Sequence, residues 1–130
     1  MGSIFSKIIA GEIPSYKIAE NDLFYAFLDV FPLVHGHTLV VPKREVDKLY
    51  DLNQEELSSM LVFAQPIARA IEKAFPCKRC GFSVIGLEVP HAHLHLVPMQ
   101  TADDLNFTRP KLKPTSEELV DAQQRILAYL

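Results

Sequence analysis

The stretch that decides the fold runs from Val89 to Pro98 and reads Val-Pro-His-Ala-His-Leu-His-Leu-Val-Pro. Its three histidines, His91, His93 and His95, alternate with small or apolar residues. Because successive side chains of a strand point to opposite faces, the three imidazoles are expected on one face and the apolar side chains on the core face. Imidazoles titrate near neutral pH and suit proton or phosphoryl chemistry. We predict a strand ending at Pro98 or Met99; an exposed, tag-like segment is the plainer alternative, which the strict alternation disfavours.

The rest of the chain predicts helices and strands that pack around this segment. Two capping boxes, at Asn53 to Glu56 and at Thr115 to Glu118, mark the beginnings of two helices, and Pro66 is expected to kink the first of them. The order of elements indicates an α+β domain built on an antiparallel sheet. The predicted elements are a helix over 3–10, strands over 16–20, 23–28 and 37–41, a helix over 54–74, strands over 82–87 and 91–99, a surface loop over 100–114 and a helix over 116–129.

Length and composition restrict the class of protein. A chain of 130 residues with 48% hydrophobic residues suits a single domain over 1–130. The net charge of −3 argues against a nucleic-acid or membrane-surface partner. Since no signal peptide or membrane-spanning run is visible, a cytoplasmic location is expected. The only two cysteines, Cys77 and Cys80, are interpreted as reduced thiols in a turn, and no metal or cofactor is predicted.

The five histidines fall in two clusters, His35 with His37 and the three from His91 to His95. One imidazole could act as a nucleophile while its neighbours handle protons and charge. Alternatively, two or three rings with His37 or Glu88 could hold a metal, as in a cupin-like protein. A third possibility is a module whose histidines only bind an anion. The spacing by itself does not choose among these chemistries.

The segment from His91 to Val97 resembles the histidine triad signature, in which three histidines alternate with apolar residues. Residues 4–14, 27–30 and 36–43 resemble the Hint-like branch of that family, so the likeness covers roughly residues 1–100 and leaves 101–130 with an uncertain role. The resemblance implies a five-stranded antiparallel sheet with a long helix packed on it. It also implies a homodimer joined through the long helix and the edge of the sheet.

The family resemblance implies hydrolysis at the α-phosphate of a purine nucleotide conjugate, such as an adenosine phosphoramidate, with release of AMP. His93 is the expected nucleophile and forms a nucleotidyl-histidine; His95 and His91 are expected to donate to the phosphoryl oxygens and leaving group, and His37 to support them. A catalytically weak nucleotide-binding or regulatory protein is the alternative within this family.

The resemblance also implies a nucleoside pocket. Asp29 matches the carboxylate that accepts the ribose hydroxyls, and the backbone N–H groups of Glu88 and Val89 are expected near the phosphate. Apolar side chains are expected to form the walls around the base, although their pattern alone favours core packing. These are Ile4, Phe5, Ile8, Phe27, Leu28 and Val30.

The sequence departs from the family in two places. Ile85 and Leu87 stand where an asparagine and a glutamine are expected, in a loop several residues shorter, so two polar contacts to the phosphate and leaving group are lost. Altered leaving-group preference or reduced rate is expected. Some members hold a structural zinc with two cysteines and a histidine, and here those positions are Ser3, Ser6 and Glu45.

Overall fold

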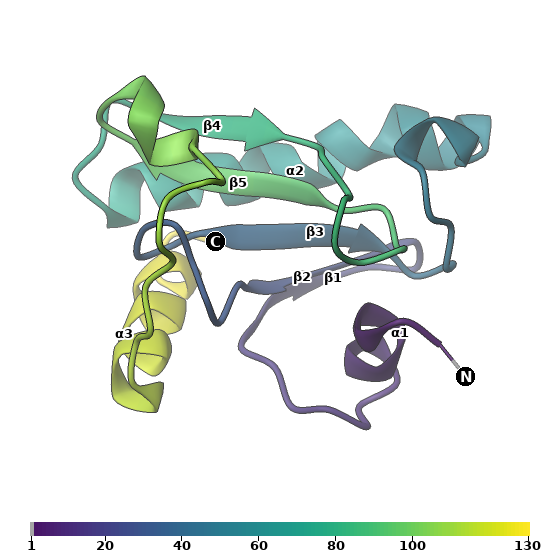
Figure 1. Ribbon diagram of the computed structural model, residues 1–130, viewed down its shortest axis with the longest axis horizontal. Coiled ribbons are helices and arrows are strands. Elements are labelled where there is room, and N and C mark those ends of the chain that lie inside the picture. Colours follow the sequence, from purple (N-terminus) through teal and green to yellow (C-terminus); the bar gives the residue numbers. More distant parts are fainter. Residues whose placement is uncertain (1) are drawn as a thin grey trace.

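A five-stranded antiparallel sheet forms the centre of the computed structural model, which describes residues 2–130 (Figure 1). Its strands lie in the spatial order β1-β2-β3-β5-β4, so β1 and β4 are the edges. The α+β class and the antiparallel sheet are confirmed. The strands are β1 (Lys17–Glu20), β2 (Phe24–Leu28), β3 (Thr38–Pro42), β4 (Arg79–Ser83) and β5 (Leu94–Met99).

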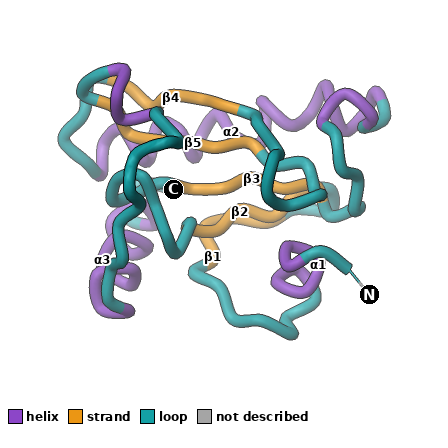
Figure 2. Tube along the Cα trace, viewed as in Figure 1, coloured by secondary structure: helices purple, strands orange, loops and turns teal. Residues whose placement is uncertain are grey.

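Helices lie on both faces of the sheet (Figure 2). The long helix α2 (Gln54–Ala74) and the C-terminal helix α3 (Ser116–Leu127) cover one face, and the short helix α1 (Ile4–Ile9) lies on the other. None of the helices described in residues 2–130 is long and apolar enough to span a membrane. The core beneath α2 and α3 contains Phe24, Ala26 and Leu28 of β2, Val40 of β3, and Leu94 and Leu96 of β5.

The helix beginnings follow the predicted caps. Asn53 and Glu56 exchange the two hydrogen bonds of a capping box at the start of α2, and Thr115 and Glu118 do the same at α3. The helix α2 continues through Pro66, which is exposed to solvent. The kink at this proline stays a prediction.

Two predicted boundaries differ from the structure. The strand expected over 82–87 is β4 and begins at Arg79, while the strand expected from His91 is β5 and begins at Leu94. The pairing of β4 with β5 ends at Ser83 opposite His95. Residues 84–93 therefore form a loop, with Gly86 at a φ of 77°, because no partner strand is left for them. The surface loop predicted over 100–114 contains a 3-10 helix, η2 (Ala102–Leu105).

Candidate active site

The sheet face opposite α2 carries the histidines. Alternation along β5 places Leu94 and Leu96 in the core under α2, so His95 faces the other way. The helix α1 packs on this second face through Phe5, whose ring lies 5.0 Å from the ring of His93 and 5.7 Å from that of His91, centroid to centroid. All three histidines of the signature are buried, with at most 7% of each exposed. The N-terminal helix and the histidine segment thus form one packed unit.

The hydrogen bonds of His93 fix which ring nitrogen carries the proton. Its Nδ1 lies 2.7 Å from the backbone carbonyl of His91, and a carbonyl only accepts. Nδ1 must therefore carry the proton and donate. In the neutral ring this leaves Nε2 with a free lone pair, which is the form that a nucleophilic histidine needs.

A relay of two hydrogen bonds fixes the position of the proton on His95. The backbone N–H of Leu33 donates to Nδ1 of His37 at 3.0 Å, so the proton of a neutral His37 lies on Nε2. That Nε2 donates to Nδ1 of His95 at 2.9 Å. The proton of His95 consequently lies on Nε2, from which it can be donated to a bound group.

Burial keeps this relay uncharged. It lowers the pKa of His37 to about 3, with a smaller effect from the neighbouring His95. Burial likewise lowers the pKa of His95 to about 3, with smaller effects of the neighbouring His93 and of the ammonium of Lys111. Both rings are therefore neutral at physiological pH, as the fixed tautomers require.

His91 has no ring nitrogen left for a substrate. Its Nε2 donates to the carbonyl of Pro42 at 2.8 Å, and its Nδ1 accepts from the hydroxyl of Ser3 at 2.6 Å. The side chain is completely buried. The expectation that His91 donates to the phosphoryl group does not fit this geometry. Its carbonyl instead positions His93, so His91 is a supporting residue.

The positions matched to a zinc site form a hydrogen-bonded cluster. One oxygen of Glu45 accepts from the backbone N–H of Ser3 and from the hydroxyl of Ser6, each at 2.6 Å. The hydrogen bond from Ser6 holds the pKa of the Glu45 carboxyl below its usual value. Structural zinc sites use thiolates and imidazoles, and neutral hydroxyls are poor substitutes. The residues here do not fit zinc, and their hydrogen bonds connect α1 to His91 without it.

Asp29 follows β2 and lies beside the relay. One of its carboxylate oxygens accepts from the backbone N–H of Phe31 at 2.9 Å, and the other lies 3.8 Å from Nε2 of His37. Burial raises the pKa of this carboxyl. The side chain is 20% exposed, so a ligand could reach the carboxyl group.

Among residues 2–130, one group of side chains has possible metal-ligand atoms that all lie within 4.8 Å of one another. It consists of Asp29, His37 and His95. However, a histidine that binds a metal through Nε2 carries its proton on Nδ1. Nδ1 of His37 faces the N–H of Leu33, which demands a lone pair there. The geometry therefore favours a proton relay over the cupin-like alternative.

The apolar residues expected around a base divide among three locations. Phe5, Phe27 and Ile8 pack together on the histidine face. Ile4 and Val30 are 49% and 43% exposed and contact solvent. Leu28 does not join them, because it points into the core under α2. Adjacent residues of a strand cannot share a face, so the period-two pattern already separated Phe27 from Leu28.

The loop before the histidines presents its backbone. Neither Glu88 nor Val89 donates its backbone N–H to an acceptor among residues 2–130, so both amides are available to an anion. The side chains of Ile85 and Leu87 are 45% and 90% exposed and offer no hydrogen bond. The side chains at positions 85 and 87 therefore provide no polar contact to a phosphate on this side of the site.

Two residues beside the site had no signal in the sequence. The ring of Phe107 lies 4.6 Å from that of His95 and 6.3 Å from that of His37, centroid to centroid. The ammonium of Lys111 lies 3.7 Å from a carboxylate oxygen of Glu88. Both come from the loop predicted over 100–114, which has no periodic pattern that could place its side chains.

Together, the sheet and the buried histidines of fixed tautomer define a protein of the histidine triad class. The HIT domain family model matches residues 10–102, and the chain belongs to this family. The family and fold resemblance recognised in the sequence is therefore confirmed.

Relatives with stated activities and known structures support this assignment. The adenosine 5′-monophosphoramidase of Saccharomyces cerevisiae is 38% identical over 96 residues, which are 73% of this chain and 61% of the yeast protein. A HIT-like protein from Bartonella henselae, described as involved in cell-cycle regulation, superposes with a TM-score of 0.85 at 32% identity, covering 98% of this chain and 96% of its own. A zinc-bound histidine triad protein from Mycobacterium smegmatis gives a TM-score of 0.83 at 29% identity, covering 97% and 91%.

Because His37 and His95 are buried and neutral in the folded protein, we predict that the free energy of unfolding depends on pH. In the unfolded chain His37 and His95 bind protons below pH 6.5, whereas in the folded protein they do so only near pH 3. Stability is therefore lost as the pH falls below 6.5, by about 2 kcal/mol for each histidine at pH 5. Urea unfolding followed by circular dichroism at pH 7, 6 and 5 measures this loss. Asp29, whose pKa burial raises, acts in the opposite direction.

The matched control for this prediction is the exposed His35. The His35→Asn protein is expected to keep the wild-type pH slope, and the His95→Asn protein to show a smaller one. Equal slopes for wild type and the His95 variant would contradict the assignment of a neutral His95.

Proposed function

We propose that this protein is a nucleotide phosphoramidase that acts at the α-phosphate of a purine nucleotide conjugate and releases AMP. The observation that carries the proposal is the ring of His93, whose protonated Nδ1 faces the carbonyl of His91 and whose Nε2 keeps its lone pair. Membership of the HIT family and the 38% identity to a yeast adenosine 5′-monophosphoramidase support the choice of adenosine phosphoramidate as substrate.

The reaction proceeds in two displacements. Nε2 of His93 attacks the α-phosphorus, a nitrogen–phosphorus bond forms, and the bond from phosphorus to the leaving nitrogen, which is protonated in the substrate, breaks to release the neutral amine. The ring is now substituted on both nitrogens and positively charged, and the carbonyl of His91 stabilises that charge through its 2.7 Å hydrogen bond. Water then attacks the phosphorus and loses one proton to solvent, and the bond to His93 breaks to give AMP and the free neutral imidazole.

The groups around His93 have separate tasks. The Nε2–H of His95, held outward by His37, donates to the phosphoryl oxygen or leaving nitrogen as charge develops there. The backbone amides of Glu88 and Val89, which have no acceptor among residues 2–130, are available to the same charge. The carboxyl group of Asp29 accepts from the ribose hydroxyls. Ile4, Phe5, Ile8, Phe27 and Val30 provide the apolar surface for the base.

The direct test is incubation of the protein with adenosine phosphoramidate, with release of AMP followed by chromatography. Turnover supports the proposal. AMP binding without any turnover on nucleotide conjugates would instead assign the catalytically weak, nucleotide-binding alternative, which the apolar Ile85 and Leu87 make the second candidate. We also propose that the protein is located in the cytoplasm. We further propose that residues 1–130 form a single HIT domain.

A homodimer is proposed as the assembly. Apolar side chains are exposed on α2, at Leu57, Leu61 and Val62, with 41 to 69% of each accessible. Phe82, on the edge strand β4, and Val84, just beyond its end, are also 40 to 41% exposed. Two such surfaces could cover each other, which would remove apolar area from water.

The variant Leu61→Asp is expected to weaken the dimer by about 100-fold, because a charge would be buried without a partner. Analytical ultracentrifugation over a range of protein concentrations measures the dissociation constant. The control is Val120→Asp, which changes an apolar residue of similar exposure on α3. A wild-type protein that sediments as a monomer at every concentration, or equal dissociation constants for Leu61→Asp and the wild type, would contradict this interface.

A further inference from the structure

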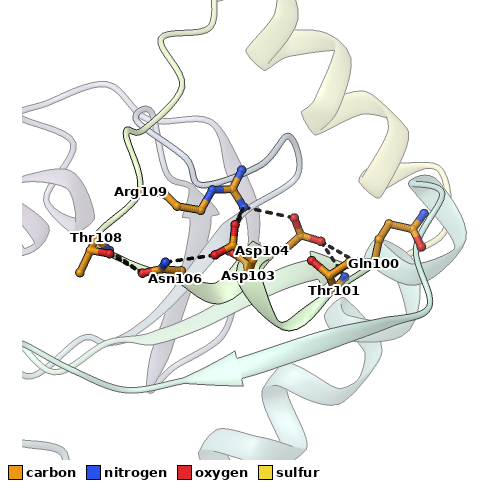
Figure 3. Close-up of polar contacts among 7 residues, drawn as sticks. All are labelled: Gln100, Thr101, Asp103, Asp104, Asn106, Thr108 and Arg109. Atoms are coloured by element: carbon orange, nitrogen blue, oxygen red, sulfur yellow. Dashed lines mark hydrogen bonds and ion pairs between the residues drawn. The ribbon is translucent and has the colours of Figure 1, made fainter.

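The segment between β5 and α3, residues 100–114, is an ordered structure that lies against the proposed catalytic face. Figure 3 shows the polar contacts that hold its first half together. A carboxylate oxygen of Asp104 accepts from the backbone amides of Gln100 and Thr101, at 2.7 and 3.0 Å. Arg109 donates to the carbonyl of Asp103 at 2.8 Å and pairs with Asp104 at 3.3 Å. These contacts fix the path of the segment before it reaches the histidines.

The segment is attached to the site at two points. The ring of Phe107 packs edge-on against His95, with ring centres 4.6 Å apart. Five residues later the backbone N–H of Leu112 donates to the carbonyl of Pro32 at 2.9 Å, in the loop that follows Asp29. In Figure 1 the green-to-yellow segment accordingly passes the end of the sheet and descends beside that loop toward α3. The residues between the two attachments therefore run from His95 to the loop after Asp29.

Lys111 lies between these attachments and brings a positive charge to the site. Its ammonium is 3.7 Å from a carboxylate oxygen of Glu88, in the loop whose backbone amides at Glu88 and Val89 have no acceptor among residues 2–130. Its charge lowers the pKa of His37 and His95 beyond the larger effect of burial. It also opposes the rise that burial produces in the pKa of Asp29. Lys111 therefore contacts the loop before the histidines, and its charge also acts on the relay and on the carboxyl of Asp29.

The contact between Lys111 and Glu88 is one that a ligand could replace. The Glu88 side chain is 82% exposed and the separation is longer than a hydrogen bond. Exposed pairs of this kind contribute little to stability, so their exchange for another anion costs little. Meanwhile Ile85 and Leu87 offer no polar contact to a phosphate.

We propose that Lys111 is a phosphate-binding residue: in the complex its ammonium leaves Glu88 and pairs with a phosphoryl oxygen of the bound nucleotide, in place of the polar side chains absent at positions 85 and 87. The proposal rests on the proposed nucleotide substrate. It assigns residues 100–114 the role of holding this charge over the site, through the attachments at Phe107 and Leu112.

The test compares ligands with and without a phosphate. Lys111→Ala is expected to weaken the binding of AMP by about tenfold, since one ammonium–phosphate pair is lost. The same variant is expected to bind adenosine with unchanged affinity, because adenosine has no phosphate. Lys111→Arg, which keeps the charge, restores most of the AMP affinity. Isothermal titration calorimetry at low salt measures the affinities of wild type and both variants for AMP and for adenosine.

Two further variants separate a local charge from a general one. Lys113→Ala removes the same charge from an exposed position two residues away and is expected to leave AMP binding unchanged. Glu88→Gln removes the competing carboxylate and is expected to strengthen AMP binding by about two- to threefold. Equal weakening by the Lys111 and Lys113 substitutions, or equal loss of AMP and adenosine binding in Lys111→Ala, overturns the proposal.

The wild-type protein separates this inference from the proposed function. If wild type binds AMP and hydrolyses the phosphoramidate while Lys111→Ala binds AMP equally well, only the role of Lys111 is wrong. If wild type neither binds AMP nor hydrolyses the phosphoramidate, the proposed function fails and the role of Lys111 fails with it.

Discussion

The variant His93→Ala is expected to lose turnover of adenosine phosphoramidate by about 10⁴-fold or more, because the nucleophile of a two-step displacement has no substitute in the site. The His93 ring is the one whose hydrogen bond to the carbonyl of His91 leaves Nε2 free. His95 keeps its proton on Nε2 and His91 has both nitrogens bonded, so neither can replace it. AMP release is measured by chromatography.

A covalent intermediate gives this prediction a second readout. Wild type quenched in base during turnover, then digested and analysed by mass spectrometry at alkaline pH, is expected to carry AMP on the peptide that contains His93. The exposed His35 is the control, and His35→Ala is expected to retain wild-type activity. Equal activity in wild type and His93→Ala rules out the assignment of His93.

The second large effect is expected at His95. Replacement by Asn removes the Nε2–H that the relay from Leu33 and His37 holds outward, at 3.0 and 2.9 Å. Loss of one positioned donor to a developing charge lowers kcat by about 10²- to 10³-fold. Because the donor acts mainly in the transition state, AMP is expected to bind His95→Asn within a few-fold of wild type. Steady-state kinetics measures the loss of kcat, and calorimetry measures the affinity for AMP.

The relay itself can be tested through His37. His37→Phe keeps a ring in the buried space but removes the donor that holds Nδ1 of His95 as an acceptor. The tautomer of His95 is then no longer fixed, so kcat is expected to fall by about tenfold, less than in His95→Asn. A loss larger than that of His95→Asn would show that His37 acts on the substrate directly.

Local patterns in the sequence were sufficient for the elements and for the faces of the sheet. The capping residues Asn53 and Thr115 mark helix beginnings because each satisfies backbone donors within its own turn. Alternation in the histidine segment places Leu94 and Leu96 in the core and His95 on the other face, because neighbouring strand residues point in opposite directions. Such features depend only on residues a few positions apart.

Boundaries and partners required the tertiary structure. The strand β5 begins only at Leu94 because its partner β4 ends at Ser83, opposite His95. No local pattern in the sequence indicates where a partner strand ends. The tautomers depend on hydrogen bonds to His37 and Pro42, which are 58 and 49 positions away from their partners. The expectation that His91 contacts the substrate failed for the same reason. The hydrogen bonds that occupy both of its ring nitrogens could not be predicted from the spacing of the histidines.

The sequence by itself therefore determined the family, the α+β sheet and the three histidines at its centre, because motif and alternation are local properties of the chain. Only the tertiary structure decided that His93 keeps a free Nε2 and that the segment with Phe107 and Lys111 lies beside the triad. The physical reason is that a proton's position and a charge's surroundings depend on groups brought together through space by folding.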